Sequence, residues 1–359
     1  MRFHGKLFAM KVVIVGCGYV SGLHVNAWRD VGASVTAVCD INEKTAMQFA
    51  EKWRIPSRHT SFSEMLQSED LFAISICTPP QFHANLAIEA LESRCHVVVE
   101  KPFTVTTKEA DKVMDTLQNS SARLTIIHSQ LFEPSMLRVM KRIKAGAIGR
   151  IVGMNVGILH SNDEPMASDR NHWCYRLPGG RFGENLPHPV YLLQTFLGKL
   201  KVKSVFTDKL GSCPWMPFDE LRVILEAEEK KIGTIYISFN APGSQRTDVY
   251  TDIYGTGGAM QAGIYPVSSL IVTKPGRGIW LAENVIDQIK IGLSYLSTIL
   301  AKQKGPRSFS ATHALIIRSF VESIFGNGEP LITPEMGYET VHIVEQICRQ
   351  IEKTSVSKN

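Results

Sequence analysis

The chain has 359 residues, of which 44% are hydrophobic and 20% charged, and 39 basic against 34 acidic residues give a formal net charge of +5. This composition excludes a disordered or low-complexity chain, and the length predicts two domains. The basic residues form no block of like charge, so we expect no nucleic-acid partner. No apolar run approaches the roughly 18 residues needed to span a bilayer, so we also expect no membrane contact.

The seven cysteines are an odd number and include no CxxC pair. Cys17, Cys39 and Cys77 lie inside apolar, strand-like runs, which is typical of reduced core residues in a cytoplasmic protein. We therefore expect no bound metal. The first ten residues are too short and too broken by polar residues for a signal peptide, and we interpret them as an extension ahead of the first strand.

The first 130 residues alternate between apolar β-branched runs and amphipathic stretches. We predict helices over 81–94 and 107–119, and strands over 11–15, 34–39, 72–77, 96–99 and 124–127. Continuous apolar strands indicate a sheet that is covered on both faces. The pattern predicts an α/β domain over residues 1–130, built on a doubly wound parallel sheet.

Residues 131–359 have a different texture, and we assign them to a second domain of α+β class. A connecting helix over 131–146, ended by Gly146, leads into longer strands with alternating hydrophobicity over 151–158, 221–226, 234–239 and 248–254. Three helices are predicted to close the chain, over 283–300, 313–325 and 335–351. Because turns rather than helices join these strands, we predict a large, open and mostly antiparallel sheet.

A glycine-rich turn directly follows the first predicted strand and consists of Gly16, Cys17, Gly18, Tyr19, Val20 and Ser21. Gly16 permits the tight turn, Gly18 lets the backbone approach a pyrophosphate, and Ser21 is small enough for helix–strand packing. About 20 residues further on, Asp40 ends the second strand, where an acid binds the adenosine ribose hydroxyls. A carboxylate there repels a 2′-phosphate, so the sequence predicts NAD rather than NADP.

Two further positions carry chemistry. Lys101 follows Glu100 at the end of the fourth predicted strand, where ligands of parallel sheets bind, although a surface lysine in a turn has the same pattern. His188 begins a predicted helix over 188–197, with Pro189 in its first turn. The helix dipole there keeps an imidazole neutral and competent as a base, but capping or packing also explains a histidine at this place.

Four elements together resemble one family: GCGYVSGLH (16–24), CTPPQFHANLAIEALE (77–92), VVVEKPF (97–103) and Glu184-xxx-His188. They resemble the Gfo/Idh/MocA oxidoreductases, the glucose–fructose oxidoreductase and inositol dehydrogenase superfamily. The resemblance runs from about residue 10 to residue 352. It implies an N-terminal Rossmann domain that binds NAD, and a C-terminal substrate-binding domain whose open sheet joins the subunits of a homodimer or homotetramer.

The resemblance also implies the reaction, a hydride transfer between the nicotinamide and a hydroxyl-bearing carbon of a sugar, nucleotide sugar or cyclitol. Lys101 matches the lysine that contacts cofactor and substrate, His188 matches the general acid/base, and Glu184 matches a position that usually holds Asp. The implied cofactor contacts are Gly16, Gly18, Tyr19, Val20, Ser21, Asp40, Thr78, Pro79, Pro80, His83, Glu100, Lys101 and Gln130. The chain departs from the family pattern in Glu184 and in the prolines that flank His188.

Cations and aromatic residues gather just before the glycines at 179–180, and we assign Arg170, His172, Trp173 and Arg176 to substrate binding. An aromatic face with cations suits a sugar ring that carries phosphate or carboxylate, so we expect a nucleotide-linked sugar. The alternative is an ordinary loop whose tryptophan packs between the domains.

The sequence leaves two alternatives to a dehydrogenase. One is a redox-assisted sugar hydrolase or epimerase that retains its NAD, and the other is a non-catalytic, NAD-binding regulator. The helix predicted over 283–300 raises a separate question, because its apolar residues recur at helical spacing. We expect it to pack on the C-terminal sheet or at a subunit interface, and the alternative is an interfacial membrane helix.

Overall fold

The computed structural model describes residues 10–68, 70–160, 169–241, 249–265, 269–274, 285, 286, 289, 292, 293, 308–326 and 328–357. The chain divides into two compact units. The first comprises Met1–Ser129 and Arg307–His342, and the second comprises Gln130–Pro306 and Ile343–Asn359. The chain thus enters the second unit at residue 130 and returns to the first unit near its C-terminus.

A parallel sheet forms the centre of the first unit. Its six strands are β1 (Lys11–Val15), β2 (Ser34–Cys39), β3 (Ser57–His59), β4 (Ala73–Ile76), β5 (His96–Val99) and β6 (Leu124–Ile126). They lie in the order β3-β2-β1-β4-β5-β6, and every neighbouring pair is parallel. This order confirms the predicted doubly wound sheet.

Helices connect these strands and bury their apolar faces against the sheet. They are α1 (Ser21–Asp30), α2 (Glu43–Trp53), α3 (Phe62–Ser68), the 3₁₀ turn η1 (Pro80–Phe82), α4 (His83–Glu92) and α5 (Thr107–Gln118). A capping box starts α5: the Glu109 N–H donates to Thr106 Oγ1 at 3.2 Å, and the Thr106 N–H donates to the Glu109 carboxylate at 3.1 Å. The helix therefore begins where its own sequence satisfies the free backbone donors.

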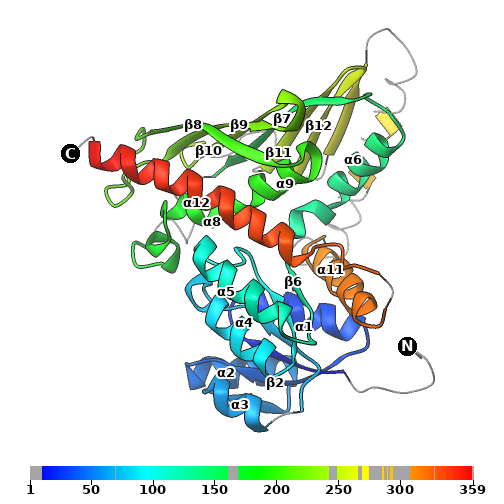
Figure 1. The fold of residues 1–359 in the computed structure, drawn as a ribbon, viewed down its shortest axis with the longest axis vertical. Coiled ribbons are helices and arrows are strands. Elements are labelled where there is room, and N and C mark those ends of the chain that lie inside the picture. Colours follow the sequence, from blue (N-terminus) through cyan, green and yellow to red (C-terminus); the bar gives the residue numbers. More distant parts are fainter. Residues whose placement is uncertain are drawn as a thin grey trace. The chain divides into compact units, whose positions relative to one another are not determined.

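A late segment of the chain completes this unit. The helix α11 (Ser308–Ile324) lies beside α1, as Figure 1 shows in orange and blue. It buries Ile316, Ile317 and Phe320, and the Phe320 ring meets His96 of β5 edge-on with centroids 6.4 Å apart. The following helix, α12 (Pro334–Ser357), begins in the first unit and ends in the second.

The second unit is built on a larger sheet. Its strands are β7 (Ile151–Leu159), β8 (Leu200–Asp208), β9 (Glu220–Ala227), β10 (Ile232–Ser238), β11 (Val249–Gly255), β12 (Gly258–Tyr265) and β13 (Ser269–Thr273). They lie in the order β13-β12-β11-β7-β10-β9-β8, and all pairs are antiparallel except β10 with β7. The predicted mostly antiparallel sheet is confirmed, whereas β8, β12 and β13 were not predicted.

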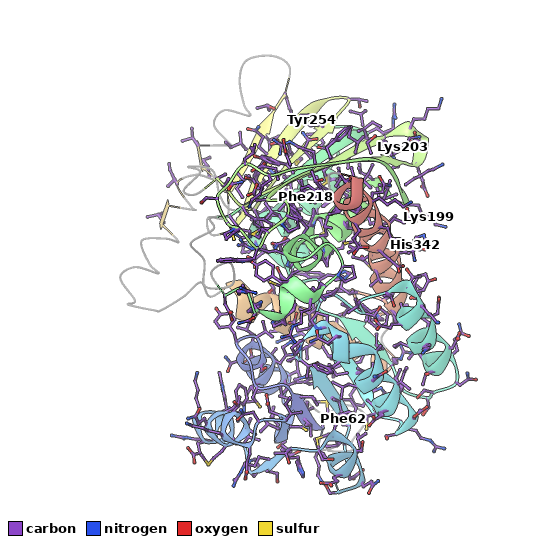
Figure 2. The ribbon with its side chains drawn as sticks, turned by 90° about the vertical axis from the view of Figure 1, so that its left-hand side faces the viewer. Phe62, Lys199, Lys203, Phe218, Tyr254 and His342 are labelled. Atoms are coloured by element: carbon purple, nitrogen blue, oxygen red, sulfur yellow. The ribbon has the colours of Figure 1, made fainter. Side chains whose placement is uncertain are left out.

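The remaining described elements of this unit are η2 (Ser129–Phe132), α6 (Pro134–Lys144), η3 (Trp173–Arg176), α8 (Arg181–Asn185), α9 (Pro187–Leu197) and η4 (Glu228–Lys230). One face of the sheet stays exposed and carries large side chains, among them Phe206, Ile224 and Tyr254. Figure 2 shows Tyr254 and Lys203 on this sheet. Most of the helix predicted over 283–300 lies outside the described residues.

All seven cysteines are free, and six of them are buried, which agrees with the predicted unpaired core cysteines. Among the described residues, no helix combines the length and the apolar character that crossing a bilayer requires.

Candidate functional site

The glycine-rich turn lies where β1 passes into α1, at the carboxyl edge of the parallel sheet. Gly16 has φ +87°, and a Cβ on it would lie 2.8 Å from the Cys77 carbonyl oxygen, so both its conformation and its surroundings require glycine. Gly18 differs, because a Cβ there would meet nothing within 4 Å. Ser21, which stands in place of the third glycine, is buried and donates its hydroxyl proton to the Gly16 carbonyl oxygen at 2.7 Å.

Asp40 fastens this turn to the end of β2. The Cys17 N–H donates to Asp40 Oδ2 and the Asn42 N–H donates to Oδ1, both at 2.9 Å. Ile41, the residue after Asp40, and Tyr19, in the glycine-rich turn, are each 90% exposed. Exposed apolar surface beside an acid suits the base and the ribose of an adenosine.

The N-terminus of α1 is open to an anion. Within residues 10–68, no side chain caps this helix end, and the first turn contains no acidic residue. Thr78, in the loop after β4, has a buried hydroxyl oxygen with no hydrogen-bond partner in the described part of the chain. A free helix N-terminus, a glycine facing open space and an unsatisfied hydroxyl together fit a dinucleotide phosphate group.

His83 joins the two loops that follow β4 and β5. Its Nε2 lies 2.8 Å from the Thr78 carbonyl oxygen, and its Nδ1 lies 2.8 Å from the Pro102 carbonyl oxygen. Burial lowers the pKa of His83, against the effect of these carbonyl groups, so the ring is neutral and donates to one of the two oxygens at a time. Pro79 and Pro80 lie in the first of these loops, next to Thr78.

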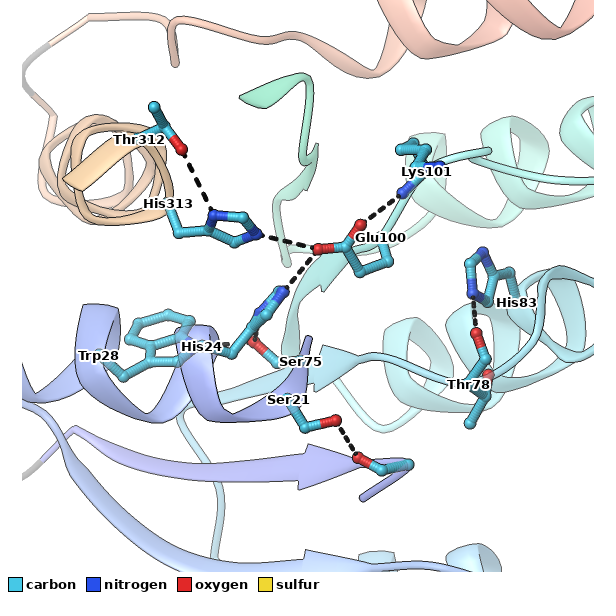
Figure 3. A network of polar contacts seen from close by, with 11 residues as sticks. Ser21, His24, Trp28, Ser75, Thr78, His83, Glu100, Lys101, Thr312 and His313 are labelled. Carbon is cyan, nitrogen blue, oxygen red and sulfur yellow. Dashed lines mark hydrogen bonds and ion pairs between the residues drawn. The ribbon is translucent and has the colours of Figure 1, made fainter. Parts of the chain in front are cut away.

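Glu100 follows β5 and is buried with two histidines around it (Figure 3). Its Oε1 lies 3.0 Å from Nε2 of His24 and 3.1 Å from Nε2 of His313, and its Oε2 accepts the Lys101 N–H at 3.1 Å. Burial alone would raise the pKa of Glu100, but the hydrogen bonds from His24 and His313 hold it well below its usual range. Glu100 is therefore a carboxylate, and Lys101, half-buried, is the next residue at the same strand end.

In the second unit, His188 lies in the first turn of α9, as predicted. Its Nδ1 lies 2.8 Å from the hydroxyl oxygen of Tyr191, one helical turn further on, and the two rings meet edge-on with centroids 5.6 Å apart. The Gln130 N–H donates to the same hydroxyl oxygen at 3.1 Å. The structure therefore brings Gln130 and His188 together through Tyr191, which the sequence analysis did not identify.

Glu184 and Arg181 lie on the short helix α8. Burial raises the pKa of the Cys174 thiol to about 12, with Glu184 adding to the rise and Arg181 opposing it, which places both charges near this sulfur. Arg181 is 2% exposed, and its Cζ lies 4.0 Å from the centroid of the Phe239 ring. The glycine-rich entry thus holds a buried cation ahead of His188.

The residues assigned to the substrate lie around η3 and differ in exposure. Arg170 and Arg176 are exposed, whereas His172 and Trp173 are half-buried with their rings 5.1 Å apart. His172 Nδ1 accepts the Cys174 N–H at 3.3 Å, so this histidine caps η3. The observed contact of His172 is therefore a local structural one. The two exposed arginines present positive charge that an anion could bind.

Three residues near Glu100 were also missed: His24, His313 and Ser75, which His24 contacts. Ser75 could have been found from the sequence, because it is a polar residue inside a buried apolar strand. Tyr191 could have been found from its i, i+3 spacing from His188. His313 could not have been found in this way, because its contact with Glu100 depends on the return of the chain to the first unit.

Comparison with known proteins identifies the family. The sequence model described as "Oxidoreductase family, NAD-binding Rossmann fold" matches residues 10–128, and that of the GFO/IDH/MocA C-terminal domain matches residues 136–261. The chain belongs to the GFO/IDH/MocA oxidoreductase family, and its first unit carries the NAD-binding Rossmann fold.

Individual relatives are distant. Oxidoreductase P35 of Formosa agariphila is 24% identical over 207 residues, which are 56% of this chain and 63% of the relative. A glycosyl hydrolase family 109 protein of Streptomyces coelicolor is 28% identical over 170 residues, 45% of this chain and 36% of the relative. The chain thus spans less than two thirds of the length of these curated relatives.

A solved structure has the same fold. The WlbA dehydrogenase of Bordetella pertussis, solved with NADH and UDP-GlcNAcA, superposes with a TM-score of 0.77 at 19% identity, covering 95% of this chain and 96% of that one.

The buried histidines of the first unit make its stability depend on pH. Burial lowers the pKa of His128 to about 3 from the ordinary 6.5, against the opposing charge of Glu100. Below pH 6.5 the unfolded chain therefore binds a proton that the folded chain does not, and stability falls by about 1.4 kcal/mol per pH unit for this histidine alone. We expect urea denaturation at pH 7, 6 and 5 to show this decline, and the variant His128→Gln to show a shallower one. Equal slopes in the two proteins would contradict the assignment.

Proposed function

We propose that this protein is an NAD-dependent dehydrogenase that transfers a hydride between the nicotinamide and a hydroxyl-bearing carbon of a sugar, with nucleotide sugars as the first substrate class to test. The observation that carries this proposal is the edge of the parallel sheet. There the open Gly18, the uncapped N-terminus of α1, Asp40 and Lys101 follow the ends of β1, β2 and β5. This arrangement can grip a dinucleotide and place a cation near its reactive end.

The proposed chemistry assigns one role to each candidate residue. Bound NAD would accept the hydride. His188 takes the proton of the substrate hydroxyl, and Lys101 donates a hydrogen bond to the same oxygen as it becomes an alkoxide. Because Nδ1 of His188 faces the Tyr191 hydroxyl, the proton is exchanged at Nε2. Glu184 binds a neighbouring substrate hydroxyl or orients the imidazole.

The substrate class rests on the charge around η3. Arg170 and Arg176 are exposed on either side of the half-buried Trp173, a combination that suits a sugar ring with an anionic substituent. The WlbA dehydrogenase, which shares the fold, was solved with UDP-GlcNAcA, a ligand that carries such groups. Both facts support a nucleotide sugar ahead of a neutral sugar or a cyclitol.

Loss of the proposed catalytic groups tests this function. After a screen of nucleotide sugars, free sugars and inositols for NADH absorbance has found a substrate, we expect His188→Ala and Lys101→Met each to lower kcat by about 10²–10⁴-fold, as loss of acid–base or charge stabilisation does. Lys108→Met, which removes an exposed lysine of α5, is the matched control and should keep full turnover. Turnover of His188→Ala within about tenfold of the parent would refute the acid–base role.

Asp40 supports the proposed preference for NAD over NADP. Its carboxylate already accepts two backbone N–H groups, and its negative charge stands where a 2′-phosphate would bind. In Asp40→Asn the side-chain oxygen can still accept the Cys17 N–H, while the charge is lost. We expect this variant to raise the affinity for NADP relative to NAD by about tenfold in calorimetry, since roughly one charge–charge repulsion is removed. Asp30→Asn, at the exposed end of α1, should leave the ratio unchanged, and an unchanged ratio in Asp40→Asn would disprove the assignment.

A second function is favoured by one comparison. The name of the matched glycosyl hydrolase family 109 protein favours a redox-assisted hydrolase, in which the sugar is oxidised on a retained NAD, its glycosidic bond breaks, water takes the place of the leaving group, and the sugar is reduced again. Mass spectrometry of the purified protein separates the two proposals. If one dinucleotide is bound per chain, and the sugar is turned over without net formation of NADH, the hydrolase is the correct function and the dehydrogenase is not.

We also propose that the exposed sheet face of the second unit joins copies of the chain. Phe206, Ile224 and Tyr254 on this face are 60%, 39% and 42% exposed, and large exposed apolar surface marks interaction sites. We expect light scattering after size exclusion to give the mass of a dimer or tetramer, and the variant Ile224→Lys to shift it toward the monomer. A monomeric parent protein at micromolar concentration would contradict this.

A further inference from the structure

Glu100 is the only carboxylate in the described residues that two histidines approach closely enough to form a three-residue cluster of metal-ligand type. His24 comes from α1, Glu100 follows β5, and His313 comes from α11, so three separate elements meet here within the first unit. Their exposed fractions are 0%, 7% and 3%. No step of the proposed reaction uses the two histidines.

The Glu100 carboxylate can only accept, so it places the His24 proton on Nε2, and the other contacts of His24 agree with this. The Trp28 ring N–H, which can only donate, lies 2.7 Å from the Ser75 hydroxyl oxygen, so that oxygen accepts. Ser75 can then donate its own proton to His24 Nδ1, 3.0 Å away, which leaves the His24 proton on Nε2, facing Glu100. Burial lowers the pKa of His24, against its hydrogen bond with Glu100, and this agrees with a neutral ring that donates from Nε2.

Hydrogen bonds alone satisfy the described contacts of this cluster, without a metal ion. A zinc ion held by His24 would need a bare Nε2, and Ser75 would then accept from Nδ1 as well as from Trp28 instead of donating to His24. The distances of 3.0 and 3.1 Å from the two Nε2 atoms to the same carboxylate oxygen are ordinary lengths for N–H···O bonds. Two imidazoles therefore donate to one oxygen of a buried carboxylate.

The other carboxylate oxygen leads to Lys101. Oε2 accepts the backbone N–H of Lys101 at 3.1 Å, while the Glu100 N–H is bound to the Ile76 carbonyl oxygen at 3.0 Å. One oxygen of the Glu100 side chain is thus held by α1 and α11, and the other oxygen holds the backbone of the next residue, Lys101. Fixing the carboxylate fixes the backbone from which the Lys101 side chain starts.

We propose that His24 and His313 are positioning residues, which clamp the Glu100 carboxylate and through it hold the backbone of Lys101. The importance of Lys101 for catalysis rests on the proposed function, but the clamp itself does not. In this proposal, α11 not only packs against α1 but also supplies, through His313, one of the two imidazoles that hold Glu100 at the end of β5.

The rate of hydrogen exchange at the Lys101 amide measures directly whether the clamp is intact, because that N–H is bound to the Glu100 carboxylate. The amide of Ile127, which donates to the Val99 carbonyl oxygen at 2.9 Å in the neighbouring strand pair, is the internal reference. We expect His313→Leu to speed exchange at Lys101 by about tenfold or more relative to Ile127, since a hydrogen bond to a charged group is weakened. His313→Gln keeps an N–H donor on a side chain of similar reach, and should restore exchange to within about threefold of the parent.

His96→Leu is the matched control, because His96 begins the same strand and also contacts α11 through Phe320. It should lower stability without changing the ratio of exchange at Lys101 to that at Ile127. An unchanged ratio in His313→Leu, or an equal change in His96→Leu, would overturn the proposal. So would one equivalent of transition metal per chain in the purified protein by elemental analysis.

The kinetic readout separates this proposal from the proposed function. With a known substrate, His313→Leu should lower kcat by about tenfold with the dissociation constant of NAD within about threefold, and His313→Gln should recover kcat. A faster Lys101 amide without loss of kcat would leave the clamp standing and remove the catalytic role of Lys101. A lower kcat with an unchanged amide would remove the clamp.

Discussion

A buried carboxylate is the feature around which the first unit is arranged. Taking an ionised carboxyl group out of water is costly unless charged or hydrogen-bonding partners replace the water. The Glu100 carboxylate obtains its partners from α1, from the Lys101 N–H and from α11. His313 follows all the described strands of the second unit in sequence, so the last of these partners is supplied only by the segment that returns to the first unit.

The fold was predictable where local sequence and burial agree. The central strands β1, β2, β4 and β5 are apolar, β-branched runs that are buried on both faces, so their pattern is strong. The edge strand β3 consists of Ser57, Arg58 and His59, which carry no such pattern and become a strand only by pairing with β2. The strand β12 contains two glycines and escaped prediction for a similar reason. Pairing partners, rather than the residues themselves, decide such segments.

The candidate site divides in the same way. The glycine-rich turn is a local feature, so the spacing of Gly16 and Gly18 was enough to predict it. The structure adds that Gly16 has no room for a side chain against Cys77. The place of Lys101 at a strand end and of His188 at a helix start marked both residues, but each place also allowed a purely structural reading, and the motif resemblance decided between the two. The clamp of His24 and His313 and the contact of Tyr191 with His188 were missed, because side chains that meet through tertiary contacts leave little trace in sequence.

The two units also differ in how their residues compare with the family pattern. In the first unit, Ser21 replaces a glycine, but its hydroxyl bonds to the Gly16 carbonyl oxygen, so the turn keeps its shape. In the second unit, the motif resemblance implies Asp where Glu184 stands, and prolines flank His188; a glutamate lengthens the carboxylate arm, and the prolines stiffen the helix start. A shared cofactor edge constrains the first unit, whereas different substrates require different side chains elsewhere on the same fold. In the function proposed here, positions 184, 187 and 189 lie beside the group that meets the substrate, so the search for that substrate begins with Glu184.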